Sequence, residues 1–179
     1  ILGDSHAAVW YPTFQVAAET QHWKGVLVSL AGCPPIFGIS SFDGAKNICK
    51  EGFDKRIGEL IETKQFQKIF LVAFWSMYSE GEPTKRPNHF ISDVENTAYD
   101  AATSKSVIAK HLQETIRRMN EKGIEVVIVH TVPTLPKRIQ DLPENYTQPL
   151  VDVQQRNFFM TDFVHQQRTP LQLSSVDPT

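Results

Sequence analysis

A serine stands between an acid and a histidine at the start of the sequence, in Gly3-Asp4-Ser5-His6-Ala7. The apolar pair before it predicts a strand end, so Ser5 falls where a first strand gives way to a first helix. Free N–H groups and the positive end of the helix dipole at such a place stabilise an oxyanion on a bound carbonyl. Ser5 is therefore a candidate nucleophile, with Asp4 and His6 near the site. The same residues also suit an ordinary turn in which Asp4 or Ser5 caps the helix.

Short apolar runs alternate along the chain with segments of helical period. The runs cover residues 1–2, 26–30, 69–75, 124–130 and 171–176, and helices are expected within 49–61, 108–119 and 151–167. Gly123 fits the C′ position after the second of these helices. The alternation predicts one doubly wound α/β domain, in which ligands bind beyond the carboxyl ends of the strands. The prolines within 133–149 predict a long surface loop.

Composition excludes several classes of function. The 179 residues carry a formal charge of −2, and no basic run exceeds two residues, so we expect no nucleic-acid partner. The longest apolar run, residues 69–75, is far shorter than the ~20 residues of a membrane helix, so this stretch is not expected to span a membrane. We expect a single domain over 1–179 that is truncated at both ends; for the N-terminal end the reason is that the sequence starts inside the first expected strand.

The cysteines, Cys33 and Cys49, flank a stretch rich in proline, glycine and serine. Neither belongs to a CxxC pair or has a histidine at metal-ligand spacing, so no metal site is expected. A disulfide is the favoured interpretation and implies an oxidising compartment. The alternative is two buried free thiols in a reducing one.

Four segments together resemble the SGNH (GDSL-like) hydrolase superfamily. They are GDSHA at 3–7, GCPP at 32–35 with a cysteine downstream, FWSMYSEG at 74–81 and VVIVHTVP at 126–133. The resemblance is closer still to the SGNH domain fused to membrane acyltransferases that O-acylate bacterial surface polysaccharides. It implies a flavodoxin-like three-layer α/β/α sandwich with a mainly parallel sheet.

The resemblance also implies roles for single residues. Ser5 corresponds to the serine that attacks an acyl carbonyl and forms an acyl-enzyme. Its own N–H and that of Gly32 are the expected oxyanion donors, although Gly32 also suits a tight turn before the prolines. The family's oxyanion asparagine is missing, because the matching strand end reads Ala73-Phe74-Trp75-Ser76. The candidate replacements are the Ser76 hydroxyl, the Trp75 indole N–H and a local backbone N–H, and the sequence does not choose among them.

Aromatic residues near that strand end have two interpretations. Trp75 and Tyr78 either offer a stacking face for a sugar or cover the end of the sheet.

The family's catalytic Asp and His form a DxxH motif close to the C-terminus. Asp162 and His165 match its letters but fall inside an expected helix. They are a candidate catalytic pair, and the alternative, which we expect, is that the true motif lies beyond residue 179. His130 is interpreted as structural, and His111 as a surface or helix-face residue.

The resemblance implies an extracytoplasmic serine acyltransferase or esterase. It would move a short acyl group, acetyl by expectation, onto or off a hydroxyl of a bacterial cell-surface glycan. No cofactor is expected, because the acyl group would come from a membrane acyltransferase domain of the same parent chain. This places the domain in the periplasm, tethered to the inner membrane. The alternatives are a free-standing secreted carbohydrate acetylesterase and a non-catalytic glycan-binding module.

Overall fold

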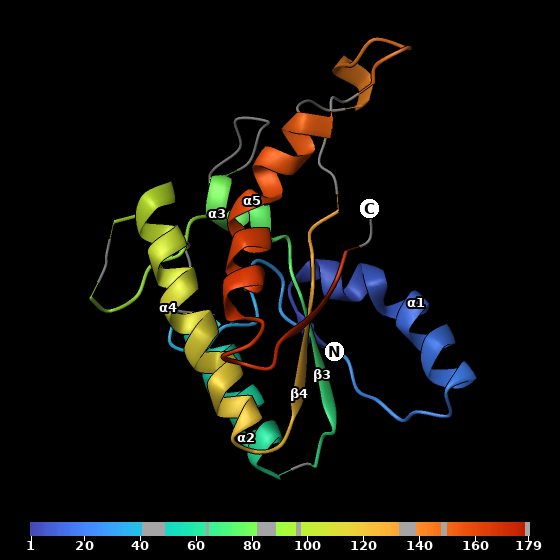
Figure 1. The fold of residues 1–179 in the computed structure, drawn as a ribbon, viewed down its shortest axis with the longest axis vertical. Coiled ribbons are helices and arrows are strands. Elements are labelled where there is room, and N and C mark those ends of the chain that lie inside the picture. The colour runs from blue at the N-terminus through green and yellow to red at the C-terminus, as the bar shows by residue number, and fades with distance from the viewer. Residues whose placement is uncertain are drawn as a thin grey trace.

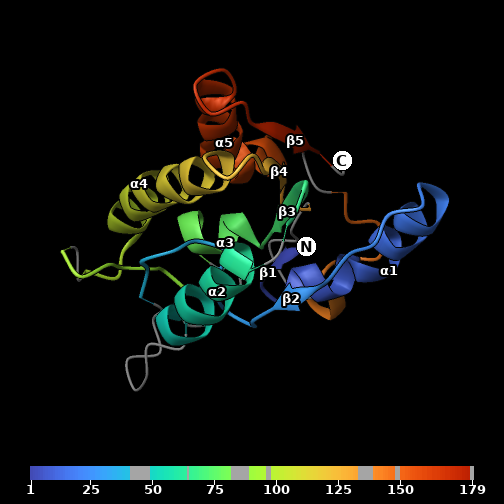
Figure 2. The same ribbon diagram turned by 90° about the horizontal axis from the view of Figure 1, so that it is seen from below.

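A parallel five-stranded sheet, in the order β2-β1-β3-β4-β5, forms the centre of the molecule. Its central strands β3 and β4 are labelled in Figure 1, and all the strands are labelled in Figure 2. The computed structural model describes residues 1–40, 49–63, 65–81, 89–95, 98–132, 139–147 and 150–177. The strands are β1 Leu2–Gly3, β2 Val28–Ser29, β3 Lys68–Val72, β4 Glu125–Val129 and β5 Ser174–Val176. This strand order is that of flavodoxin-like folds, so the predicted fold class is confirmed.

Helices cover both faces of the sheet (Figure 2). One face carries α1, Ser5–Thr20; the other carries α2, Arg56–Thr63, α4, Ala101–Asn120, and α5, Leu150–Gln167. A π-helical turn, Lys50–Lys55, leads into α2, and a short 3-10 helix spans Ile139–Asp141. The short α3, Trp75–Glu80, follows β3 at the carboxyl edge of the sheet. The three layers arise because alternate side chains of each buried strand point to opposite faces.

The larger hydrophobic core lies between the sheet and α2, α4 and α5. Leu71 and Ile128 of the central strands meet Ile116 of α4 there, and all three are fully buried. The smaller core, on the α1 face, contains Ala7, Val72 and Val129. The helix-to-strand junction after α4 is as predicted, since Gly123 has φ +73 and its N–H donates to the carbonyl of Asn120 at 2.8 Å.

Several strands are shorter than their apolar runs. Only residues 28–29 of the run 26–30 pair with β1, and only 174–176 of the run 171–176 pair with β4. The run 69–75 ends as a strand at Val72, and Trp75 begins α3. An apolar run shows which residues are buried, and residues stay buried beyond the point where hydrogen bonding between the strands ends. Of the predicted loop at 133–149, residues 139–147 are described and contain only the short 3-10 helix, and the remaining residues of the loop lie outside the described ones.

The turn after β1 requires glycine. A Cβ built on Gly3 would lie 1.8 Å from the carbonyl oxygen of Val72 and 2.7 Å from the Cβ of Ala7. Glycine therefore lets β1 and β3 approach closely while the chain turns into α1.

Candidate active site

Ser5 lies at the carboxyl edge of the sheet, as the first residue of α1 directly after β1. It is exposed, and its N–H and hydroxyl make no hydrogen bond to the described residues. Asp4 caps the helix instead, accepting the N–H of His6 at 2.7 Å. Of the two residues proposed as caps, it is therefore Asp4 that serves, and the Ser5 hydroxyl is left available for chemistry.

Asp4 joins three strand ends through hydrogen bonds. It is fully buried, its N–H donates to the carbonyl of Val72 at 3.3 Å, and its carbonyl accepts the hydroxyl of Ser29 at 2.7 Å. Carboxylate oxygen Oδ2 accepts the N–H of Phe74 and the hydroxyl of Tyr78, both at 2.9 Å. The residue before Ser5 is thus fixed to the ends of β2 and β3 and to α3.

His6 lies beside Asp4 and packs on an aromatic ring. Its Nδ1 is 3.5 Å from Oδ1 of Asp4, and its ring centroid is 4.6 Å from that of Phe74. The side chain is 28% exposed, so it is adjacent to Ser5 and open to solvent. Contact of His6 with a substrate stays a prediction.

The turn after β2 holds Gly32 beside this edge. The N–H of Leu30 donates to the carbonyl of Gly3 at 2.9 Å, which ties the end of β2 to the residue before Asp4. Gly32 has φ +72, a value that favours glycine, and within the described ranges its N–H has no acceptor. An unengaged N–H at this edge is what an oxyanion donor requires. The role of Gly32 stays a prediction.

A disulfide joins Cys33 and Cys49, as predicted, with Cα atoms 5.4 Å apart and both residues buried. The Sγ of Cys49 also lies 3.9 Å from the carbonyl oxygen of Gly32. The cross-link therefore holds the turn that carries Gly32 against the start of the π-helical segment.

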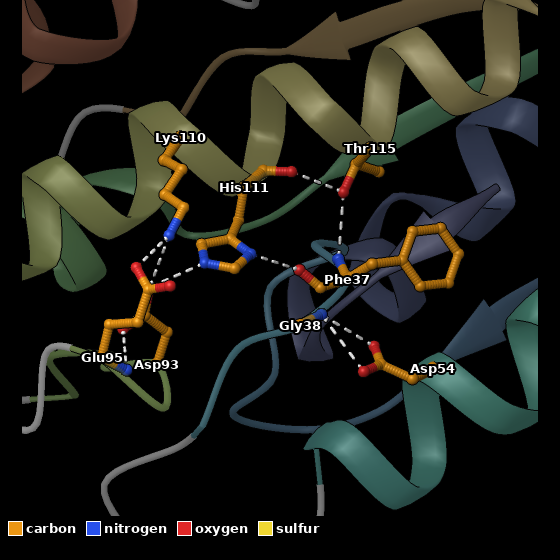
Figure 3. A network of polar contacts seen from close by, with 8 residues as sticks. All are labelled: Phe37, Gly38, Asp54, Asp93, Glu95, Lys110, His111 and Thr115. Atoms are coloured by element: carbon orange, nitrogen blue, oxygen red, sulfur yellow. Dashed lines mark hydrogen bonds and ion pairs between the residues drawn. The ribbon is translucent and has the colours of Figure 1, made fainter.

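A polar network fixes the chain just after this turn (Figure 3). The N–H of Phe37 donates to Oγ1 of Thr115 at 3.0 Å, and the N–H of Gly38 donates to Oδ1 of Asp54 at 3.0 Å. His111 of α4 reaches the carbonyl of Phe37 with Nδ1, at 3.1 Å, and Oδ2 of Asp93 with Nε2, at 2.8 Å.

The position of His111 corrects the sequence interpretation. It is not a surface residue, because its side chain is 17% exposed and bridges two segments far apart in the sequence. Both ring nitrogens lie within hydrogen-bond distance of oxygen atoms, one of Phe37 and one of Asp93. Apolar spacing along α4 could not reveal this, since the partners come from outside the helix.

Trp75 is part of the core. It is fully buried, and its indole N–H donates to the carbonyl of Val129 at 2.9 Å. That donor is occupied, so the expectation that Trp75 contributes to an oxyanion hole is wrong. Tyr78 is also fully buried, so neither ring presents a stacking face, and both cover the end of the sheet.

Ser76 is enclosed at the start of α3. Its N–H donates to Oγ1 of Thr131 at 3.3 Å, while its hydroxyl is buried without a partner. Its use as an oxyanion donor stays a prediction that requires the hydroxyl to become accessible.

The structure does not bring Asp162 and His165 to Ser5. Both lie towards the C-terminal end of α5, His165 is exposed, and Oδ2 of Asp162 accepts the side-chain amide of Gln166 at 2.7 Å. A helix that feeds into a parallel strand ends at the amino edge of the sheet, opposite the edge that holds Ser5 (Figure 1). The pair is therefore excluded as the catalytic pair.

His130 directly follows β4, at the same edge of the sheet as Ser5. It is nearly buried, and burial lowers its pKa, with a smaller opposing effect of Asp177. Among the described residues, no group of three or more acidic, histidine or cysteine side chains is placed to hold a metal ion. In that same part of the chain no helix is long and apolar enough to cross a membrane.

Comparison with known proteins gives two similarities. The sequence model of a family described as "SGNH domain (fused to AT3 domains)" matches residues 1–179. A solved structure, the periplasmic domain of a lipopolysaccharide acetyltransferase from Salmonella ser. Paratyphi A, is similar with a TM-score of 0.60 at 15% sequence identity. The match covers 99% of this chain and 64% of that one, and at this identity it concerns the fold. No curated protein sequence matches.

Proposed function

The chain belongs to the family of SGNH domains that are fused to AT3 domains, and from this premise we propose a serine-dependent acyltransferase domain. It transfers a short acyl group, acetyl by preference, to a hydroxyl of a bacterial cell-surface glycan through an acyl-serine intermediate. The observation that carries the proposal is Ser5 itself: it is exposed at the start of α1, and its hydroxyl is not used as a cap.

The proposed reaction has two halves. The Ser5 hydroxyl attacks the acyl carbonyl and its proton passes to a histidine base, which then gives that proton to the donor's leaving group as it departs. The N–H groups of Ser5 and Gly32 stabilise the oxyanion. In support of this, neither N–H donates a hydrogen bond to another group within the described residues. The acceptor hydroxyl then loses its proton to the same base and takes the acyl group, and the base returns the proton to the Ser5 oxygen, which regenerates Ser5.

The base and the acyl donor lie outside the described residues in this proposal. None of the described histidines is hydrogen-bonded to Ser5, and we propose that the base belongs to a segment after residue 179. The family's fusion to AT3 domains supports a membrane domain of the parent chain as the source of the acyl group, without a further cofactor. It supports an extracytoplasmic, membrane-tethered location as well.

The test is covalent labelling of the full parent chain with a fluorophosphonate, read by peptide mass spectrometry. We expect the label on Ser5, its loss in Ser5→Ala, and unchanged labelling in Ser106→Ala, which removes an exposed hydroxyl from α4. Because Asp4 rather than Ser5 caps the helix, Ser5→Ala should fold normally. No labelling of a folded parent chain would favour a glycan-binding module.

A further inference from the structure

Tyr78 is buried 74 positions away from the acid that precedes the nucleophile, and the two side chains meet. We propose that Tyr78 is a positioning residue, whose hydroxyl fixes the Asp4 carboxylate and thereby the turn that presents Ser5. This inference rests on the proposed function of Ser5 and adds to it a residue that never touches the substrate.

The first step concerns the hydrogen bonds that the Asp4 carboxylate accepts. A buried carboxylate must receive hydrogen bonds to replace those of water. Oδ1 receives the N–H of His6 at 2.7 Å, and Oδ2 receives the N–H of Phe74 and the Tyr78 hydroxyl, each at 2.9 Å. Tyr78 is the one side-chain hydroxyl in this set, so deleting its oxygen leaves every backbone donor in place.

The second step concerns the rigidity of Tyr78. It is fully buried, and its carbonyl accepts the hydroxyl of Ser104 from α4 at 2.7 Å. The Ser104 hydroxyl accepts in turn the N–H of Ile91 at 3.0 Å. Burial, followed by the charge of Asp4, raises the pKa of Tyr78 well above its ordinary value. The phenol therefore stays protonated at physiological pH and always acts as the donor.

The third step links Asp4 to the chemistry. Asp4 is extended, with ψ −157, and this backbone angle sets the direction of the Ser5 N–H. The bonds from Phe74 and Tyr78 restrain Asp4, so their loss frees this angle to change and lets the nucleophile move relative to Gly32. A displacement of about 1 Å in such a site costs up to ~100-fold in rate. Loss of one of three donors is expected to cost about tenfold.

The experiment compares Tyr78→Phe with Tyr11→Phe, which removes a hydroxyl from a tyrosine that is 42% exposed on α1. In the full parent chain, fluorophosphonate labelling of Ser5 gives a reversible binding constant and a maximal rate of inactivation. We expect the maximal rate to fall about tenfold in Tyr78→Phe while binding changes less than twofold, and both to stay unchanged in Tyr11→Phe. A rate within twofold of wild type would overturn the proposal.

Amide hydrogen exchange gives a readout that does not depend on activity. The amides of His6 and Phe74, which donate to Asp4, should exchange faster in Tyr78→Phe, whereas the amide of Leu112 in α4 reports only global stability. An equal change at all three amides would show a merely structural role and overturn positioning. If wild type is not labelled at all, the proposed function fails, yet exchange still decides whether Tyr78 holds Asp4.

A second variant covers the case in which Tyr78→Phe does not fold. 3-Fluorotyrosine at position 78 keeps the ring and the hydroxyl and makes the phenol a stronger donor. Exchange at His6 and Phe74 should then become slower than in wild type, and unchanged exchange would contradict the proposal.

Discussion

Removing the Cys33–Cys49 disulfide should destabilise the domain measurably. The cross-link spans a sequence separation of 16, and closing a loop of that length in the unfolded chain is worth about 3 kcal/mol in the chain-entropy model. For a chain of 179 residues, whose entropy of unfolding grows with length, this corresponds to a fall of about 8 °C in Tm. The perturbation is the double variant Cys33→Ala/Cys49→Ala.

The assay combines thermal and urea unfolding of the double variant with that of wild type under reducing conditions. Both residues are fully buried, so the alanines also remove packing atoms, whereas reduction keeps the sulfurs. If the cross-link is responsible, reduced wild type should lose most of the same stability. Ser5 labelling should also slow, because Cys49 contacts the carbonyl of Gly32.

A loss below about 1 kcal/mol in both proteins would refute this reasoning. It would mean that the chain after Cys33 is held by its other contacts. These are chiefly the hydrogen bonds that join Phe37 to α4 and Gly38 to Asp54. A large loss in the alanine variant with none on reduction would assign the effect to packing instead.

Three further changes have defined outcomes. Gly3→Ala should lower the free energy of unfolding by about 3 kcal/mol or prevent folding, as read by urea unfolding, because the new Cβ meets the carbonyl of Val72. Burial lowers the pKa of His130 below its ordinary 6.5, so the unfolded chain binds a proton at this residue more readily than the folded one. The free energy of unfolding should therefore fall as the pH drops below about 6.5, and His130→Asn should remove this contribution, as read by urea unfolding at several pH values. Trp75→Phe should lower stability by about 1–3 kcal/mol, yet keep the labelling rate of the folded protein, whereas a ~100-fold slower rate would restore its indole as an oxyanion donor.

The local pattern of the sequence was enough to predict the fold class and the place of Ser5. Apolar runs that alternate with helical periods specify buried strands and one-sided helices, because burial of each element follows its own repeat. Gly123 marked the turn after the helix that ends at Asn120, and the structure has that turn with φ +73 at Gly123, a value that favours glycine. The cysteine spacing favoured the disulfide that the structure contains.

Contacts between distant residues were decided only by the tertiary structure. Tyr78 meets Asp4, and Trp75 gives its indole N–H to Val129, through pairings that leave no trace in spacing. Asp162 and His165 match a DxxH motif in sequence, but the direction of α5 places them at the edge of the sheet opposite Ser5. The sequence alone therefore determined most of the elements and the place of Ser5, the candidate nucleophile, at the start of α1, since these depend on neighbours along the chain. Tertiary packing decided which hydrogen-bond donors are free and which are occupied, because the donor and the acceptor come from segments that only folding brings together.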